Sequence, residues 1–184
     1  KDYAPTLMHE EALKFIERNK DESFFLYYAS PLPHLPLQAP VKWVNYYKEK
    51  FGKEEPYTGG SGYYPNQYPK ATYAAMISYL DQQVGELVKK LKEIGKNENT
   101  LIIFSSDNGP THIKHVDIDF FNSAGPFLNS ENTVKGNLNE GGIRVPTIVT
   151  WPEVISSGSE SNHPSTFYDY LATVSDLVSV SPPY

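Results

Sequence analysis

The segment Tyr73–Pro110, "YAAMISYLDQQVGELVKKLKEIGKNENTLIIFSSDNGP", joins a helical pattern to a buried strand through a short polar loop. Between positions 70 and 94 the apolar residues recur at the i, i+3, i+4 and i+7 spacing of an amphipathic helix. Gly95 stands where a left-handed C-terminal cap is expected, and the continuous apolar run at 100–106 follows as a strand. This order of elements predicts an α/β unit.

The flanking sequence continues the alternation of helices and strands. Helical spacing predicts further helices at 8–19, at 40–51 with Pro40 as the first residue and Gly52 as the stop, and at 165–178 with Ser165 or Thr166 as the N-cap. Apolar runs predict buried strands at 24–30 and 145–151. We therefore expect an α/β fold, with a mostly parallel sheet and helices on both faces, forming a single domain over residues 1–184.

Composition argues against several classes of function. The chain has 16 basic and 22 acidic residues and a formal charge of -6, without a basic cluster that would bind nucleic acid phosphates. The longest apolar run, at 24–29, is far shorter than the roughly 20 residues of a membrane-spanning helix. Cysteine is absent, which excludes a disulfide framework, a thiolate metal site and a cysteine nucleophile within the chain.

Asp107, Asn108 and Gly109 follow the carboxyl end of the predicted strand at 100–106, where ligands gather in open α/β sheets. A carboxylate beside an amide oxygen suits Ca²⁺ or Mg²⁺, and glycine lets the backbone turn tightly under the ion. The same three residues are also typical of a simple Asn-Gly turn. The triplet alone therefore leaves both a metal site and a turn open.

Two loops supply further candidates. His34 lies in the proline-rich stretch "SPLPHLPLQAP", 30–40, where it could be a ligand or general acid or simply a solvated surface residue. Lys135 opens the glycine-rich bend "KGNLNEGGIRVP", 135–146, where it could bind a sulfate or phosphate oxyanion or simply be an exposed loop lysine. Glu140 and Arg144 bracket that bend, and we expect them to form a structural ion pair.

Two other segments are interpreted as parts of the site entrance. In "THIKHVDID", 111–119, the spacing of His112, His115, Asp117 and Asp119 matches no zinc signature, so this loop is expected to line the entrance, with His112 able to touch substrate. The tyrosine-rich excursion from Glu54 to position 68 is expected to help form a substrate cleft.

Four segments of the sequence together resemble segments of the type I sulfatases in their number, order and spacing. They are "FFLYYASPLPHLPL" (24–37), the segment 73–110, "FFNSAGPF" (120–127) and "KGNLNEGGIRVPTIVTWP" (135–152). The resemblance implies an alkaline-phosphatase-like fold and hydrolysis of sulfate esters by a formylglycine nucleophile with one Ca²⁺. It implies that Asp107 and Asn108 are the second pair of calcium ligands. It further implies that Lys135 binds the substrate sulfate and that His34 contacts the sulfate ester and helps the leaving oxygen depart.

The family's first pair of metal-binding aspartates and its nucleophile motif, C/S-x-P-S/T-x-R, do not occur in this sequence. We expect them upstream of Lys1, so the chain is interpreted as an incomplete, C-terminal portion of a catalytic domain that is inactive alone. The resemblance also implies a sulfated carbohydrate substrate and a periplasmic or secreted location. Two alternatives remain open: a phosphatase or phosphonate monoester hydrolase of the same superfamily, and a noncatalytic module that binds anionic glycans.

Overall fold

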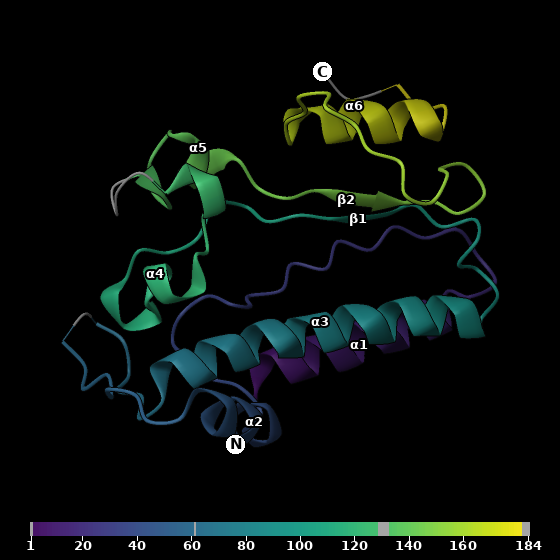
Figure 1. Ribbon diagram of the computed structural model, residues 1–184. Helices are drawn as coiled ribbons and strands as arrows, with labels where there is room; N and C mark the ends of the chain where they lie inside the picture. The colour runs from purple at the N-terminus through teal and green to yellow at the C-terminus, as the bar shows by residue number, and fades with distance from the viewer. Residues whose placement is uncertain (1, 61, 129–132, 182–184) are drawn as a thin grey trace. The chain divides into compact units, whose positions relative to one another are not determined.

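The computed structural model describes residues 2–60, 62–128 and 133–181 (Figure 1). Contacts divide the chain into two compact units, Lys1–Val154 and Ile155–Tyr184. No helix in the described part of the chain is long and apolar enough to cross a membrane. The elements, in chain order, are α1 (Ala4–Arg18), α2 (Val41–Phe51), α3 (Pro69–Glu93), β1 (Ile102–Phe104), α4 (Ile118–Phe121), α5 (Glu140–Ile143), β2 (Ile148–Thr150) and, in the second unit, α6 (Tyr168–Leu177).

Helix α3 is the centre of the first unit, and α1 and α2 both pack against it. The Thr6 hydroxyl hydrogen-bonds to the Tyr79 hydroxyl at 2.7 Å, and His9 Nε2 contacts Glu86 Oε2 at 2.7 Å. Because these pairs advance together along both helices, α1 and α3 run in the same direction (Figure 1).

The main apolar core joins the helices to the proline-rich loop at 31–40. Its buried members come from that loop, from α3 and from the short helical turn at 114–116: Leu32, Leu35, Leu37, Tyr73, Met76, Tyr79 and Val116. The three buried leucines anchor a loop that has no strand or helix of its own, so the core fixes the backbone on both sides of His34.

The predicted end of α3 is confirmed. Gly95 has a φ of 69°, and its N–H donates to the Lys92 carbonyl at 3.1 Å. The Lys96 N–H donates to the Leu91 carbonyl at 2.9 Å, which completes the pair of bonds of a glycine C-cap. This cap turns the chain directly toward β1.

The other helix predictions are confirmed with shifted ends. Helix α1 begins four residues earlier than the periodicity predicts, with proline in its first turn. Pro40 precedes α2 as its N-cap and is not its first residue, while Gly52 ends α2 as expected. Helix α6 begins at Tyr168, and neither predicted side chain caps it; instead the Asp169 carboxylate accepts the Thr166 N–H at 2.6 Å.

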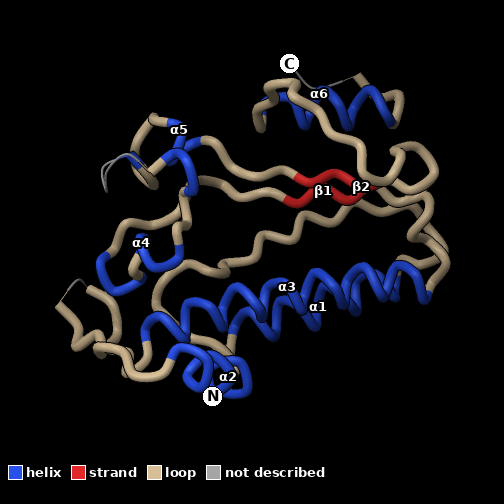
Figure 2. Tube along the Cα trace, viewed as in Figure 1, coloured by secondary structure: helices blue, strands red, loops and turns tan. Residues whose placement is uncertain are grey.

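The strands β1 and β2 pair antiparallel, with Ile103 opposite Val149 (Figure 2). Within the described residues they form one two-stranded sheet, so the mostly parallel arrangement is not seen in this pair. The physical reason lies in the connection. The described residues between the strands, 105–128 and 133–147, form loops and single helical turns, and they contain no long crossover helix of the kind that joins parallel strands.

The prediction of a buried strand at 24–30 is wrong both about the strand and about its burial. This segment is extended, but it forms no strand in the structure, and Phe25 and Tyr27 are 77% and 81% exposed. The alternate side chains face the helices, since the Tyr28 hydroxyl donates to Gln83 Oε1 at 3.1 Å. The segment is therefore covered on one side only, and an apolar run cannot reveal which of its faces is covered.

Candidate active site

Five residues singled out from the sequence line one cleft of about 1370 Å³ in the first unit: His34, Asp107, Asn108, His112 and Lys135. They come from three separate segments, namely the proline-rich loop, the loop after β1 and the bend before β2. The fold thus brings together His34 and Lys135, which are about a hundred positions apart in the sequence.

A backbone junction joins the loop after β1 to the bend that carries the lysine. The Gly109 N–H donates to the Gly142 carbonyl at 2.8 Å, and the Lys135 N–H donates to the Pro110 carbonyl at 3.0 Å. A Cβ placed on Gly109 would lie 1.9 Å from the Gly141 carbonyl oxygen. Only glycine allows this approach, so the junction fixes the oxygen-bearing turn relative to Lys135.

The bend itself requires two more glycines. A Cβ on Gly141 would lie 2.6 Å from the Thr133 carbonyl oxygen, and one on Gly142 would lie 2.1 Å from that of Asn137. The predicted ion pair is confirmed, with Arg144 Nη1 2.9 Å from Glu140 Oε2. Close backbone packing and this pair together hold the bend in one shape.

His34 is fixed by two hydrogen bonds to the backbone. The backbone N–H of His34 donates to the Pro31 carbonyl at 2.8 Å, and the ring Nδ1 lies 2.8 Å from the Leu35 carbonyl oxygen. Because a carbonyl oxygen only accepts, Nδ1 must carry a hydrogen. The second nitrogen, Nε2, is then the one that can accept a proton or, when the ring is protonated, donate one.

Asp107 and Asn108 supply hard oxygen atoms at the cleft. The Ser106 hydroxyl donates to the Asn108 carbonyl at 3.0 Å and so stabilises the turn. Among the described residues, neither the Asp107 carboxylate nor the Lys135 ammonium has an ion-pair or hydrogen-bond partner, so both are available to a ligand. These oxygens suit Ca²⁺ chemically, but two side chains are only part of the six to eight ligands that the ion usually takes.

The loop at 111–119 divides its residues between the cleft and the core. His112 is exposed and lines the cleft, whereas His115 stacks on Tyr57 with ring centroids 3.9 Å apart. Burial lowers the pKa of His115 below its ordinary value of 6.5. Asp117 accepts the Phe120 N–H at 3.0 Å and caps α4. Within the described residues no group of three or more His, Asp or Glu side chains could hold a metal ion.

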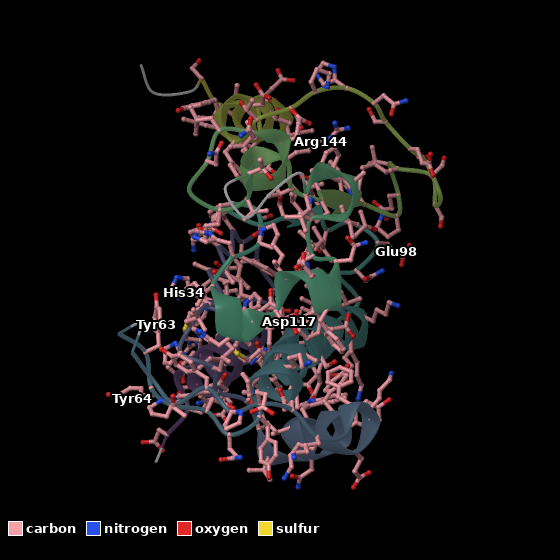
Figure 3. All side chains as sticks on the ribbon, turned by 60° about the vertical axis from the view of Figure 1, so that its left-hand side comes forward. His34, Tyr63, Tyr64, Glu98, Asp117 and Arg144 are labelled. Atoms are coloured by element: carbon pink, nitrogen blue, oxygen red, sulfur yellow. The ribbon has the colours of Figure 1, made fainter. Side chains whose placement is uncertain are left out.

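The structure adds to the cleft two residues that the sequence did not single out, Asn122 and Tyr63, and also Arg144, which was expected only to pair with Glu140. Tyr63 comes from the tyrosine-rich excursion, and Figure 3 labels both Tyr63 and Arg144. Asn122 has a left-handed φ of 46°, which asparagine tolerates better than most residues. An Asn-Ser pair after two phenylalanines was the available turn signal for Asn122, but nothing distinguished Tyr63 from the neighbouring tyrosines.

Comparison with known proteins gives a consistent set of matches. The family model described as Sulfatase matches residues 1–180. N-acetylgalactosamine-6-sulfatase of Canis lupus familiaris is 30% identical over 95% of this chain and 28% of that protein. Arylsulfatase H of Homo sapiens is 31% identical over 92% of this chain and 26% of that protein.

One solved structure shares the fold over nearly the whole chain. The crystal structure of Ps i-CgsB in complex with k-i-k-neocarrahexaose matches with a TM-score of 0.76 and 30% identity, over 98% of this chain and 35% of that one. The α/β, alkaline-phosphatase-like fold expected from the sequence is thereby confirmed. The chain spans less than two-fifths of the length of each of these relatives.

Proposed function

The chain belongs to the sulfatase family, and from this premise we propose that it forms one side of the active site of a sulfate ester hydrolase. The chain spans 28% and 26% of the length of two sulfatase relatives, and the resemblance to type I sulfatases supports the proposal that it is the C-terminal portion of that catalytic domain. The observation that carries the proposal is the junction between Gly109 and Gly142, which holds Asp107, Asn108 and Lys135 beside the cleft that His34 also lines.

In this proposal Lys135 binds an oxygen of the substrate sulfate. Its ammonium is a compact point charge that suits a tetrahedral oxyanion, and its backbone is held by the bond to Pro110. As the sulfur–oxygen bond to the alcohol breaks, negative charge develops on the departing oxygen. A fixed cation near that charge stabilises the transition state more than the bound substrate.

His34 would supply the proton for the leaving alcohol. Its Nδ1–H is engaged by the Leu35 carbonyl, so a protonated ring presents Nε2–H to the departing oxygen. Transfer of that proton releases a neutral alcohol and leaves a neutral imidazole. The backbone bonds and buried leucines on either side of His34 keep the ring from turning away.

Asp107 and Asn108 would hold Ca²⁺ together with ligands from outside this chain. The ion, when bound, would polarise the sulfate oxygens and offset their charge. The nucleophile is proposed to be a formylglycine, also outside this chain, because the motif C/S-x-P-S/T-x-R does not occur here. Both assignments rest on the resemblance to type I sulfatases and on the hard-oxygen chemistry of the two side chains.

A sulfated carbohydrate is the proposed substrate. One relative is named for a sulfated N-acetylgalactosamine, and one similar structure carries a bound hexaose. The cleft of about 1370 Å³ gives room for a leaving group as large as a sugar. We place the enzyme in the periplasm or outside the cell, a location whose support is the resemblance to type I sulfatases.

Replacement of Lys135 tests the proposed function. In the complete protein that contains this chain, Lys135→Ala should lower kcat/KM for sulfate esters by about 100-fold or more, because a donor to the transition-state oxyanion is lost. The control is Lys53→Ala, which removes an exposed lysine outside the cleft and should leave kcat/KM unchanged. Equal kcat/KM values for the two variants would contradict the assignment of Lys135.

A further inference from the structure

The cleft has an aromatic wall in addition to its charged centre. Tyr63 lines the cleft and packs against the core cluster that contains Leu32 and Leu35, the two buried leucines flanking His34. Figure 3 shows His34 and Tyr63 along the same side of the molecule, with Tyr64 next to them and projecting outward. Tyr63 therefore borders the same cleft as His34, on the same side of the molecule.

Tyr63 packs against the core, and hydrogen bonds join described residues on either side of it. Tyr57 and Asn66 exchange two backbone hydrogen bonds of 2.8 Å and close the segment that contains Tyr63. The Asn66 side-chain amide donates to the Leu37 carbonyl at 3.0 Å and so fastens this segment to the loop of His34. The ring centroids of Tyr63 and His115 lie 6.4 Å apart, with the two rings tilted by 55°.

Tyr64 offers a natural contrast. It is the same residue type at the next position, but it does not line the cleft and is 74% exposed. Tyr63 is only partly exposed and has the core on one side and the cleft on the other. An aromatic residue held in this way can present a ring to a ligand at little cost in side-chain entropy.

We propose that Tyr63 is a stacking platform for the sugar ring that bears the sulfate, and that it thereby sets a preference for sulfated pyranoses. This inference rests on the proposed sulfatase function. An aromatic face carries negative charge density, so the weakly positive C–H groups on the apolar face of a sugar ring pack well against it. Because His34 is assigned to the leaving oxygen, the ring attached to that oxygen is the one that reaches Tyr63.

The test uses the complete protein with three variants and a panel of monosulfated monosaccharides. Tyr63→Leu keeps apolar bulk against the core but removes the flat ring, and Tyr63→Phe keeps the ring. Tyr64→Leu is the matched control. The competitive inhibition constant of inorganic sulfate serves as the second measurement, because sulfate occupies the charged centre without needing a ring platform.

Tyr63→Leu should raise KM for the preferred sugar ester by roughly three- to tenfold, which corresponds to the strength of a single ring contact. Its inhibition constant for sulfate should stay unchanged, Tyr63→Phe should restore KM, and Tyr64→Leu should match the wild type. The inference is overturned if Tyr63→Leu leaves KM unchanged, if Tyr64→Leu has the same effect, or if sulfate inhibition weakens in parallel. A wild-type protein that hydrolyses aryl sulfates but no sugar ester would also overturn it, whereas one that hydrolyses no sulfate ester would overturn the proposed function itself.

Discussion

The Gly109 N–H donates to the Gly142 carbonyl across the cleft's edge, at 2.8 Å. Gly109 lies in the loop after β1 and Gly142 in α5, more than thirty residues along the chain, and a Cβ on Gly109 would lie 1.9 Å from the carbonyl oxygen of Gly141. The proposed catalytic geometry depends on this backbone contact, since the side chains proposed to bind the metal and the sulfate lie on either side of it. The junction is therefore the first place to perturb.

Gly109→Ala should separate the two loops. The added methyl group meets a backbone oxygen that cannot move without shifting α5, and such overpacking costs about 1–3 kcal/mol of folding free energy. A displacement of about 1 Å in a catalytic group can lower turnover about 100-fold, so we expect a loss of that order in kcat/KM. Steady-state kinetics and urea denaturation of the complete protein measure the two effects.

Gly85→Ala is the matched control for that variant. Gly85 lies within α3, where its added Cβ would meet no atom within 4 Å. Alanine in a helix interior is more stable than glycine by about 0.5–1 kcal/mol, so this variant should be slightly stabilised and fully active. An active Gly109→Ala protein would show that the junction does not position the site.

Removal of Asp107 tests the proposed metal site. Asp107→Ala deletes a carboxylate that lines the cleft, and we expect the Ca²⁺ concentration giving half-maximal activity to rise at least about tenfold. The measurement is activity after complete chelation, followed by titration with Ca²⁺. Asp81→Ala, which removes an exposed carboxylate on α3, should titrate like the wild type. Undiminished wild-type activity after chelation would exclude the calcium assignment.

Local signals predicted the helices well because each depends on nearby residues. The cap at Gly95 needs only a glycine after an amphipathic stretch, and the structure has it. The contact between Gly109 and Gly141 has no such local signal, since either glycine alone could serve an ordinary turn. The convergence of His34, Asp107 and Lys135 was accordingly predicted from the family resemblance and not from periodicity.

The sequence predictions that failed concern which segments of the chain pack against or bond to one another. Phe25 and Tyr27 look like buried strand residues in an apolar run, yet they are exposed because the helices cover only the opposite side of that segment. The cap of α3 by Glu54 is likewise a contact that the local sequence does not reveal. It binds the first turn of α3 from about fifteen residues upstream, and no capping motif adjacent to the helix announces that contact.

Glu54→Ala should destabilise the first turn of α3. The Glu54 carboxylate accepts the Lys70 N–H at 2.6 Å and the Ala71 N–H at 3.2 Å, two donors that the helix itself cannot satisfy. Loss of a side-chain cap costs about 0.5–2 kcal/mol of folding free energy. Urea denaturation should show this decrease for Glu54→Ala. It should show no decrease for Glu55→Ala, because the carboxylate of Glu55 is exposed. Equal midpoints for the two variants would contradict a capping role.

His115 should make stability depend on pH. Burial lowers its pKa in the folded state below the ordinary value of 6.5, so below about that pH the unfolded chain binds the proton more readily. Stability from this group is therefore full above pH 6.5 and falls as the solution is acidified through that value. His115→Phe preserves a ring on Tyr57 but cannot be protonated, so its melting temperature should fall less than that of the wild type between about pH 8 and about pH 5. His163→Phe, at an exposed position, should keep the wild-type pH dependence. An unchanged dependence in His115→Phe would mean that the half-buried ring does not resist protonation.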